Sequence, residues 1–210
     1  MPTFPVLIAF GLVAFGLVVT PGPNMIYLVS RSLSQGPRAG LISLTGVGLG
    51  FIIYMLSAAF GITAIIIAVP YAYDALRLAG ATYLLHLAWQ ALKPGGRSPF
   101  VVRELPKDSP RKLIVMGLVT NLLNPKAAML YLALLPQFID PSQGSVLSQA
   151  IALGSLQIVI SLTVNGIIAV SAGTIAMFLA KNPRWLRMQR WFMGAVLAGL
   201  AFNMLRESRS

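Results

Sequence analysis

Two short proline segments hold the residues best suited to bind a small molecule. Residues 20–24 read Thr-Pro-Gly-Pro-Asn, and residues 124–126 read Asn-Pro-Lys. Proline has no backbone N–H, so the first segment should leave the carbonyl groups of about Leu17 and Val19 without partners inside a helix. Free carbonyl groups of this kind can accept hydrogen bonds from an ammonium group, which has three donors.

The second segment offers the opposite polarity. Asparagine is a favoured N-cap and proline a favoured first helical residue, so a half-helix from Pro125 to Phe138 should begin here. Its first N–H groups and its positive dipole end would favour an anion such as a carboxylate. Asn24 could cap the half-helix after Pro23 in the same way. A site with both polarities suits a zwitterion, and amino acids are the obvious candidates.

The segments that must position these residues read as membrane spans. The 210 residues are 57% hydrophobic and 10% charged, whereas soluble domains are about 25% charged. About 20 apolar residues cross a bilayer, and six such runs are present. We therefore expect an all-α integral membrane protein with six transmembrane helices, the first and fourth broken at the proline segments. The runs cover residues 4–33, 41–69, 72–92, 113–138, 146–179 and 188–205.

The two halves of the chain resemble each other around the breaks. Gly-Leu-Val-Val at 16–19 precedes the first break, and Gly-Leu-Val-Thr at 117–120 precedes the second. An odd number of spans in each half inverts one copy relative to the other, as in many transporters. We expect a single membrane domain over 1–210, with repeat one at about 1–92, a cytoplasmic loop at 93–112 and repeat two at about 113–210.

The basic residues indicate the orientation. Most of the 16 lysine and arginine residues fall in loops after the first, third and fifth runs, whereas Arg77, Arg206 and Arg209 fall on the other side. Cytoplasmic loops carry the excess of positive charge, so both termini should face outward. The net charge of +11 is then explained by topology and membrane lipid, and not by nucleic acid.

Lys126 lies too deep in its run to reach water. It is 13 residues from Leu113 and 12 from Phe138, about 18–20 Å along a helix from either end. A lysine side chain cannot cover this distance, so its charge should face the interior of the bundle. Two roles stay open for Lys126: contact with a substrate, or structural hydrogen bonds to the free carbonyl groups of the first break.

Other polar residues in the spans give weaker indications. Asn121, Gln157 and Asn165 line the same cavity or join helices by hydrogen bonds. His86 is the only histidine, and it is either a proton relay or a packed side chain. The residues expected to bind the substrate are Pro21, Gly22, Pro23, Asn24, Asn121, Asn124, Pro125, Lys126, Gln157 and Asn165.

Small residues follow one face of the second run: Gly46, Gly50, Ser57 and Gly61. Such a stripe permits close helix packing, either within the chain or between the protomers of a homodimer. No nucleophile–base pair, metal-ligand spacing or cofactor motif is visible, so we expect neither an enzyme nor a metal or cofactor site.

The chain resembles the LysE/RhtB superfamily of small bacterial amino-acid exporters. The resemblance includes both proline segments, the glycine-rich stretch at 40–50, and residues 78–84, 121–127, 136–141 and 194–197. It implies a six-span protein of the bacterial inner membrane that exports amino acids or close derivatives, driven by the membrane potential or a coupling proton. Many relatives carry an acidic residue where this chain has Phe51, which favours a neutral or hydrophobic substrate here.

These observations predict a secondary transporter that works by alternating access, with a zwitterion bound near the midplane between the two broken helices. The alternative is a passive channel or a membrane scaffold, in which the breaks only line a pore or make room for packing. Sequence leaves the coupling ion open, because no acidic residue lies deep in any run.

Overall fold

The described part of this computed structural model is helical. It comprises residues 1–68 and 107–181, together with the positions 78, 81, 82, 85, 86, 89, 184, 188, 191, 195, 198, 199, 201 and 202. Every regular element within it is a helix, so the expected all-α class is confirmed. The third expected span (72–92) and the sixth (188–205) lie mostly outside the described residues.

The first span is broken as expected. α1 (Phe4–Val19) and α2 (Pro23–Gln35) meet at an angle of 52°. At the end of α1 the chain leaves the helix at Thr20, whose backbone is extended, and the Thr20 hydroxyl donates to the carbonyl of Gly16 at 2.8 Å. α2 then starts at Pro23, because the fixed φ of proline suits the first position of a helix.

The second break repeats this geometry in the other half of the chain. α5 (Pro110–Leu122) and the helical segment from Pro125 to Phe138 are also bent by 52°. Together the two bent pairs form two candidate spans of matching shape.

The segment after the second break is less regular than the expected half-helix. Only α6 (Pro125–Met129) is α-helical; a π-helical turn, η1 (Leu130–Leu134), and a 3₁₀ turn, η2 (Leu135–Phe138), complete it. Pro136 supplies a physical reason, since it cannot donate to the carbonyl of Leu132 and its ring crowds the preceding turn. A wider turn followed by a tighter one accommodates this defect.

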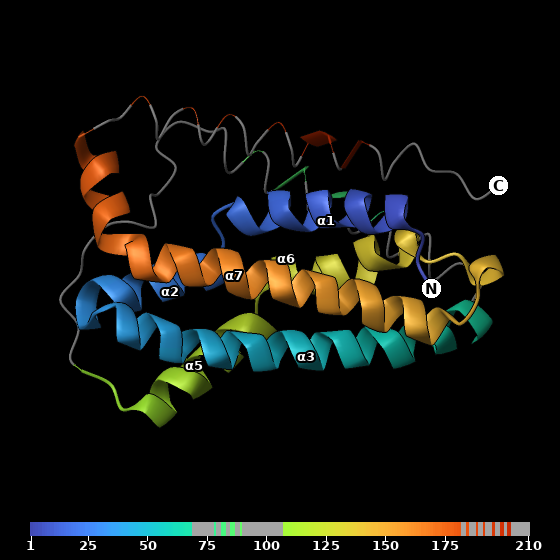
Figure 1. The fold of residues 1–210 in the computed structure, drawn as a ribbon, viewed down its shortest axis with the longest axis horizontal. Helices are drawn as coiled ribbons and strands as arrows, with labels where there is room; N and C mark the ends of the chain where they lie inside the picture. Colours follow the sequence, from blue (N-terminus) through green and yellow to red (C-terminus); the bar gives the residue numbers. More distant parts are fainter. Residues whose placement is uncertain are drawn as a thin grey trace.

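Two long helices frame the bent pairs. α3 (Pro37–Ala68) and α7 (Val146–Lys181) run side by side in opposite directions (Figure 1). Their stretches Pro37–Gly61 and Val146–Thr174 are each long and apolar enough to cross a membrane. With each bent pair taken as one span, the described part holds up to four spans. Large apolar side chains such as Leu12, Phe60 and Val159 are exposed on the flanks, as expected for a surface in lipid.

α3 and α5 pack so closely that their backbones are in contact. A Cβ added at Gly46 would overlap the carbonyl of Ile114, and one added at Gly117 would overlap the carbonyl of Ser43. Small residues at a helix crossing allow this close approach. Gly61, by contrast, has no atom of the described residues within 4 Å of its Cβ position. The part of the stripe that holds Gly46 and Gly50 therefore packs against α5 of the same chain.

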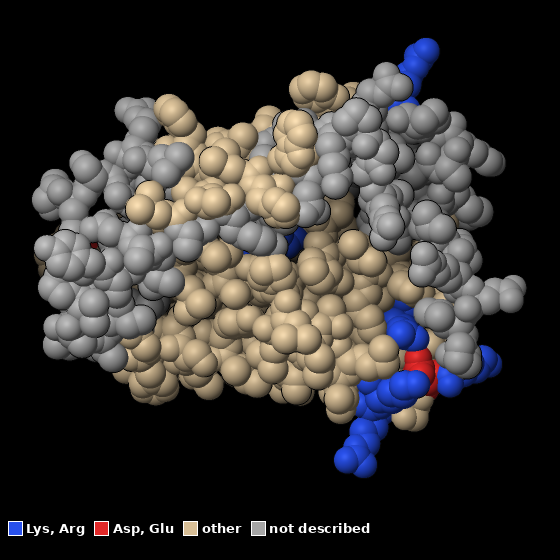
Figure 2. Space-filling view, turned by 180° about the vertical axis from the view of Figure 1, so that it is seen from behind, with Lys and Arg blue, Asp and Glu red and all other residues tan. Residues whose placement is uncertain are grey.

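Charged residues gather at one end of the molecule. Figure 2 shows lysine and arginine side chains grouped around an acidic one there. Asp108 pairs with Arg31 at the end of α2 and with Lys112 in the first turn of α5, and it also accepts from Gln35 at 2.9 Å. This end also carries the α2–α3 turn, and a short 3₁₀ turn, η3 (Pro141–Gln143), lies at the opposite end (Figure 1).

Candidate functional site

The two helix breaks meet through Lys126. Its Nζ atom donates hydrogen bonds to the carbonyl oxygen of Leu17 at 2.8 Å and to that of Thr20 at 2.6 Å. Gly22 permits this approach, because a Cβ at that position would lie only 3.0 Å from Nζ. The deep lysine therefore faces the interior of the bundle and contacts the first break directly.

The pair of accepting carbonyls differs by one residue from the expected pair. Sequence pointed to about Leu17 and Val19, but the second acceptor is Thr20. The extended backbone of Thr20 explains the difference, because its carbonyl belongs to the first peptide group that has left the helix. Of the two roles left open for Lys126, the structural hydrogen bonds are present.

Asn124 fixes the position of the Lys126 backbone. Its side-chain oxygen accepts from the backbone N–H of Lys126 at 3.0 Å and so caps α6, as expected. Asn124 is itself buried, and its N–H donates to the carbonyl of Asn121 at 3.0 Å. The start of α6 is thus held by local hydrogen bonds before the lysine side chain reaches across to α1.

Asn24 does not cap α2, contrary to the expectation from the sequence. The N-cap is Gly22, and no side chain caps this helix. Because Pro23 takes the first helical position, Asn24 becomes the second residue of the helix, where its side chain can no longer act as an N-cap. Its Oδ1 atom is buried without a hydrogen-bond partner.

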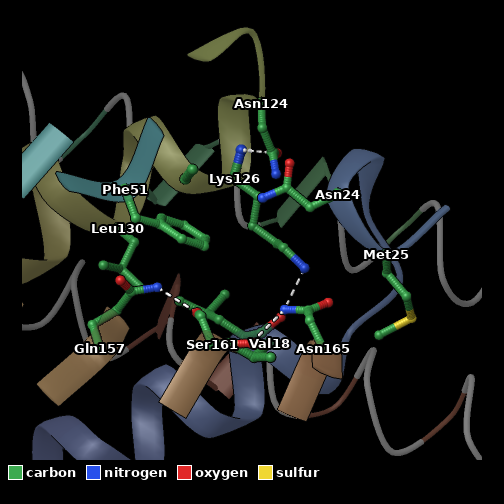
Figure 3. Close-up of a pocket in the computed structure, with 12 residues that line it drawn as sticks. Val18, Asn24, Met25, Phe51, Asn124, Lys126, Leu130, Gln157, Ser161 and Asn165 are labelled. Atoms are coloured by element: carbon green, nitrogen blue, oxygen red, sulfur yellow. Dashed lines mark hydrogen bonds between the residues drawn. The ribbon is translucent and has the colours of Figure 1, made fainter. Parts of the chain in front are cut away.

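A pocket lies where the breaks meet (Figure 3). Its apolar lining consists of Leu17, Val18, Met25, Phe51, Ala127 and Leu130. Its polar lining consists of Asn24, Asn124, Lys126, Gln157, Ser161 and Asn165. Among the residues that the structure describes, no Asp or Glu lines this pocket.

The polar wall on α7 is a hydrogen-bonded ladder. The Nε2 atom of Gln157 donates to the hydroxyl of Ser161 at 2.6 Å, and Asn165 donates to the Ser161 carbonyl at 2.9 Å. Tyr131 donates to the Oε1 atom of Gln157 and holds the amide in place. Figure 3 shows this wall opposite Lys126.

Seven lining residues were not among the site residues expected from the sequence: Leu17, Val18, Met25, Phe51, Ala127, Leu130 and Ser161. Ser161 is four residues after Gln157 and four before Asn165, a spacing that puts all three on one helix face. That spacing could have identified Ser161. The family resemblance had linked Phe51 to the choice of substrate, and the fold shows that it faces the cavity.

The remaining expected site residues lie around the pocket. Pro21, Pro23 and Pro125 shape the backbone at the breaks without lining the cavity. Asn121 is fully buried beside Gly50, outside the lining, and neither atom of its side-chain amide has a partner. His86 is exposed and does not line the pocket, so its role as a proton relay stays a prediction.

Related proteins agree with this picture. The chain is 26% identical over 201 residues to a protein named leucine efflux protein from Enterobacter sp. (strain 638), covering 91% of this chain and 90% of that one. It is 26% identical over 160 residues to the uncharacterized membrane protein YrhP of Bacillus subtilis (strain 168), covering 71% and 75%. No solved structure matches the chain.

The family model described as LysE type translocator matches residues 15–208, a range that includes both proline segments and the whole pocket. The resemblance seen in the sequence is therefore confirmed. The chain belongs to the LysE type translocator family, and it is a membrane transport protein rather than an enzyme.

Proposed function

We propose that this protein is a secondary transporter that exports amino acids or small amino-acid derivatives from the cytoplasm by alternating access. The observation that carries the proposal is the pocket at the meeting point of the two breaks, whose lining combines apolar and polar side chains. Membership of a translocator family and the likeness to a leucine efflux protein support it.

The pocket has the chemistry for a zwitterion. The carbonyl oxygens of Leu17 and Thr20 accept hydrogen bonds from a cation, and the C-terminal end of α1 adds its negative dipole. The amide of Asn24 lies at the positive N-terminal end of α2, a 13-residue helix. A zwitterion that lies between these helix ends meets favourable charge on both sides.

A neutral, apolar amino acid is the substrate class that we favour. Phe51, Met25 and Leu130 supply an apolar surface for a side chain. A lysine-like substrate would bring a second cation close to Lys126, with no carboxylate of the described lining to balance it. Leucine is therefore a suitable first substrate to test, in agreement with the name of the relative.

The architecture proposed for the whole chain is six spans in two inverted repeats, within the bacterial inner membrane and surrounded by lipid. The equal bends of 52° in the two halves support the repeat. The basic end near Asp108 would lie on the cytoplasmic side, and both termini would lie on the outer side. A homodimer contact is proposed along the small-residue stripe of α3 at Gly61, where no described atom lies within 4 Å of the Cβ position.

Counterflow in proteoliposomes tests this function. Vesicles loaded with unlabelled leucine should accumulate labelled leucine from outside, whereas vesicles without protein should not. Labelled arginine should accumulate far less, because the pocket disfavours a second cation. A passive channel would let label equilibrate without overshoot, and a scaffold would move none; either result would refute the transporter.

A further inference from the structure

Lys126 holds the two oxygen atoms that an amino-acid ammonium would use. Its Nζ atom lies 2.8 Å from the Leu17 carbonyl oxygen and 2.6 Å from that of Thr20. A lysine head group and the α-ammonium of an amino acid are the same chemical group, –NH₃⁺, with the same three donors. Whatever binds one of them well at this helix end also binds the other.

We propose that Lys126 is a tethered competitor of the substrate's amino group, and that only a zwitterion can displace it. The inference rests on the proposed function and adds the step by which the pocket selects its substrate. The incoming ammonium takes the carbonyl groups of Leu17 and Thr20. The displaced ammonium of Lys126 then binds the carboxylate of the same substrate molecule.

Competition follows from charge and burial. Two ammonium groups cannot share one pair of carbonyl oxygens, because they would repel each other at short range in a site of low dielectric constant. Lys126 lies between α1, α2 and α7, and the groups that face it in the pocket from those helices are the neutral amides of Asn24 and Asn165 and the hydroxyl of Ser161. None of these groups can neutralise a displaced lysine.

The substrate carries the missing partner itself. Among the described residues no carboxylate lines the pocket, so a carboxylate must arrive with the ligand. A charge-assisted hydrogen bond from Lys126 to that carboxylate replaces the two hydrogen bonds that Lys126 made to carbonyl groups. The flexible four-carbon stem of lysine allows its head group to move while Asn124 keeps the backbone in place.

The proposal predicts which ligands bind, and a lysine with a purely structural role would not impose this selectivity. An amine without a carboxylate, such as 3-methylbutylamine, is rejected because displaced Lys126 gains no partner. An acid without an ammonium, such as 4-methylpentanoate, is rejected because it cannot take the carbonyl groups. Leucine combines both groups on the same apolar side chain and is accepted.

Binding of these three compounds to the purified full-length protein tests the rule. Wild type should bind leucine at least about tenfold more tightly than the amine or the acid, as the loss of a charge-assisted hydrogen bond predicts. Lys126→Met should invert this order, because the amine now finds the carbonyl groups free while leucine has lost its carboxylate partner. Asn165→Ala is the matched control within the pocket and should gain no affinity for the amine.

Chemical modification of a single cysteine is a second test, because the natural sequence contains no cysteine. Lys126→Cys treated with 2-aminoethyl methanethiosulfonate regains a tethered ammonium and should again reject the amine. The same variant treated with methyl methanethiosulfonate stays neutral and should bind it.

Two results would overturn the proposal. One is a folded Lys126→Met protein that binds 3-methylbutylamine no better than wild type does. The other is wild type that binds the amine as tightly as leucine, a result that needs no variant to fold. Failure of the proposed function would give a different result. Wild type would then show no counterflow of any amino acid, regardless of how tightly it binds the amine.

Discussion

The Nζ atom of Lys126 donates a hydrogen bond to the carbonyl oxygen of Thr20 at 2.6 Å, although 106 residues separate the two in sequence. This bond joins the end of α1 to the start of α6. It exists because Thr20 leaves its helix with an extended backbone and because Asn124 caps the helix that carries the lysine. The two breaks are therefore in direct contact and are not two independent kinks.

Removing this lysine should cost both stability and transport. Lys126→Ala leaves the Thr20 carbonyl unpaired and weakens the pairing of Leu17, which also accepts from the N–H of Thr20 at 3.2 Å. A buried unpaired group costs about 1–3 kcal/mol, so we expect a free energy of unfolding lower by roughly 2–4 kcal/mol. Leucine counterflow should be lost.

Lys107→Ala is the matched control for this change. Lys107 is exposed at the surface, where charged side chains contribute about 0–1 kcal/mol. Thermal unfolding in detergent and counterflow in vesicles should both stay near wild type. Normal counterflow by a folded Lys126→Ala protein would remove Lys126 from the transport mechanism.

Phe51 should set the size of the accepted side chain. It is 4% exposed and lines the apolar part of the pocket. Phe51→Ala enlarges that part, so leucine should be transported several-fold less well and phenylalanine better, since a methylene group in an apolar site is worth about 1–3 kcal/mol. Competition between the two labelled amino acids measures the change.

A control on the same helix separates selectivity from folding. Phe60 is 65% exposed on α3 and does not line the pocket, so Phe60→Ala should leave the ratio of leucine to phenylalanine transport unchanged. An unchanged ratio in Phe51→Ala would show that the ring does not contact the substrate.

The local rules of helix termini explain which features were predictable. Proline and asparagine determine where helices break and cap, so both breaks and the cap by Asn124 could be predicted from the sequence. A lysine far from both ends of a span predicts an interior charge, and Lys126 lies in the interior. These inferences need only residues that are neighbours in sequence.

Other features were missed, one for a local reason and two because they depend on contacts between distant segments. Asn24 failed as a cap because Pro23 had already fixed the helix start one residue earlier. The role of Thr20 as the second acceptor depends on the direction in which the chain leaves α1. The place of Phe51 in the pocket wall depends on how α3 is rotated against α6 and α7, and the family resemblance linked Phe51 to substrate charge without showing which way its side chain faces.

Gly46 should be essential for the packing of α3 on α5. Gly46→Ala places a Cβ on the backbone carbonyl of Ile114, which cannot move as a flexible side chain could. We expect a loss of at least about 1–3 kcal/mol in unfolding free energy, as for other overpacked contacts. Gly61→Ala in the same helix meets no atom of the described residues within 4 Å and should be neutral or slightly stabilising. Equal thermal stabilities would contradict the close contact.

The ion-pair cluster at the basic end should give a defined pH dependence. Hydrogen bonds from Lys112 and Gln35 lower the pKa of Asp108 below its ordinary value of 3.8. A lowered pKa means that the ionised carboxylate adds stability above about pH 4 and that this contribution disappears as the pH falls through the folded-state value. Asp108→Asn should therefore melt below wild type at pH 7, and the difference should shrink toward pH 3. A constant difference would show that the charge of Asp108 is not what stabilises this end.

The orientation of the chain can be read with single cysteines, because the natural sequence contains none. Ser145 is exposed beside the η3 turn, at the end opposite the Asp108 cluster. We expect Ser145→Cys to react with a membrane-impermeant maleimide in intact cells, and Ser98→Cys to react only in inverted vesicles, because its loop is rich in basic residues. Leucine counterflow by each variant serves as the control for folding. The reverse labelling pattern would show that the chain has the opposite orientation in the membrane. Labelling of both cysteines from the same side would be more serious, because the bent pair of α5 and α6 could then not be one span that crosses between them.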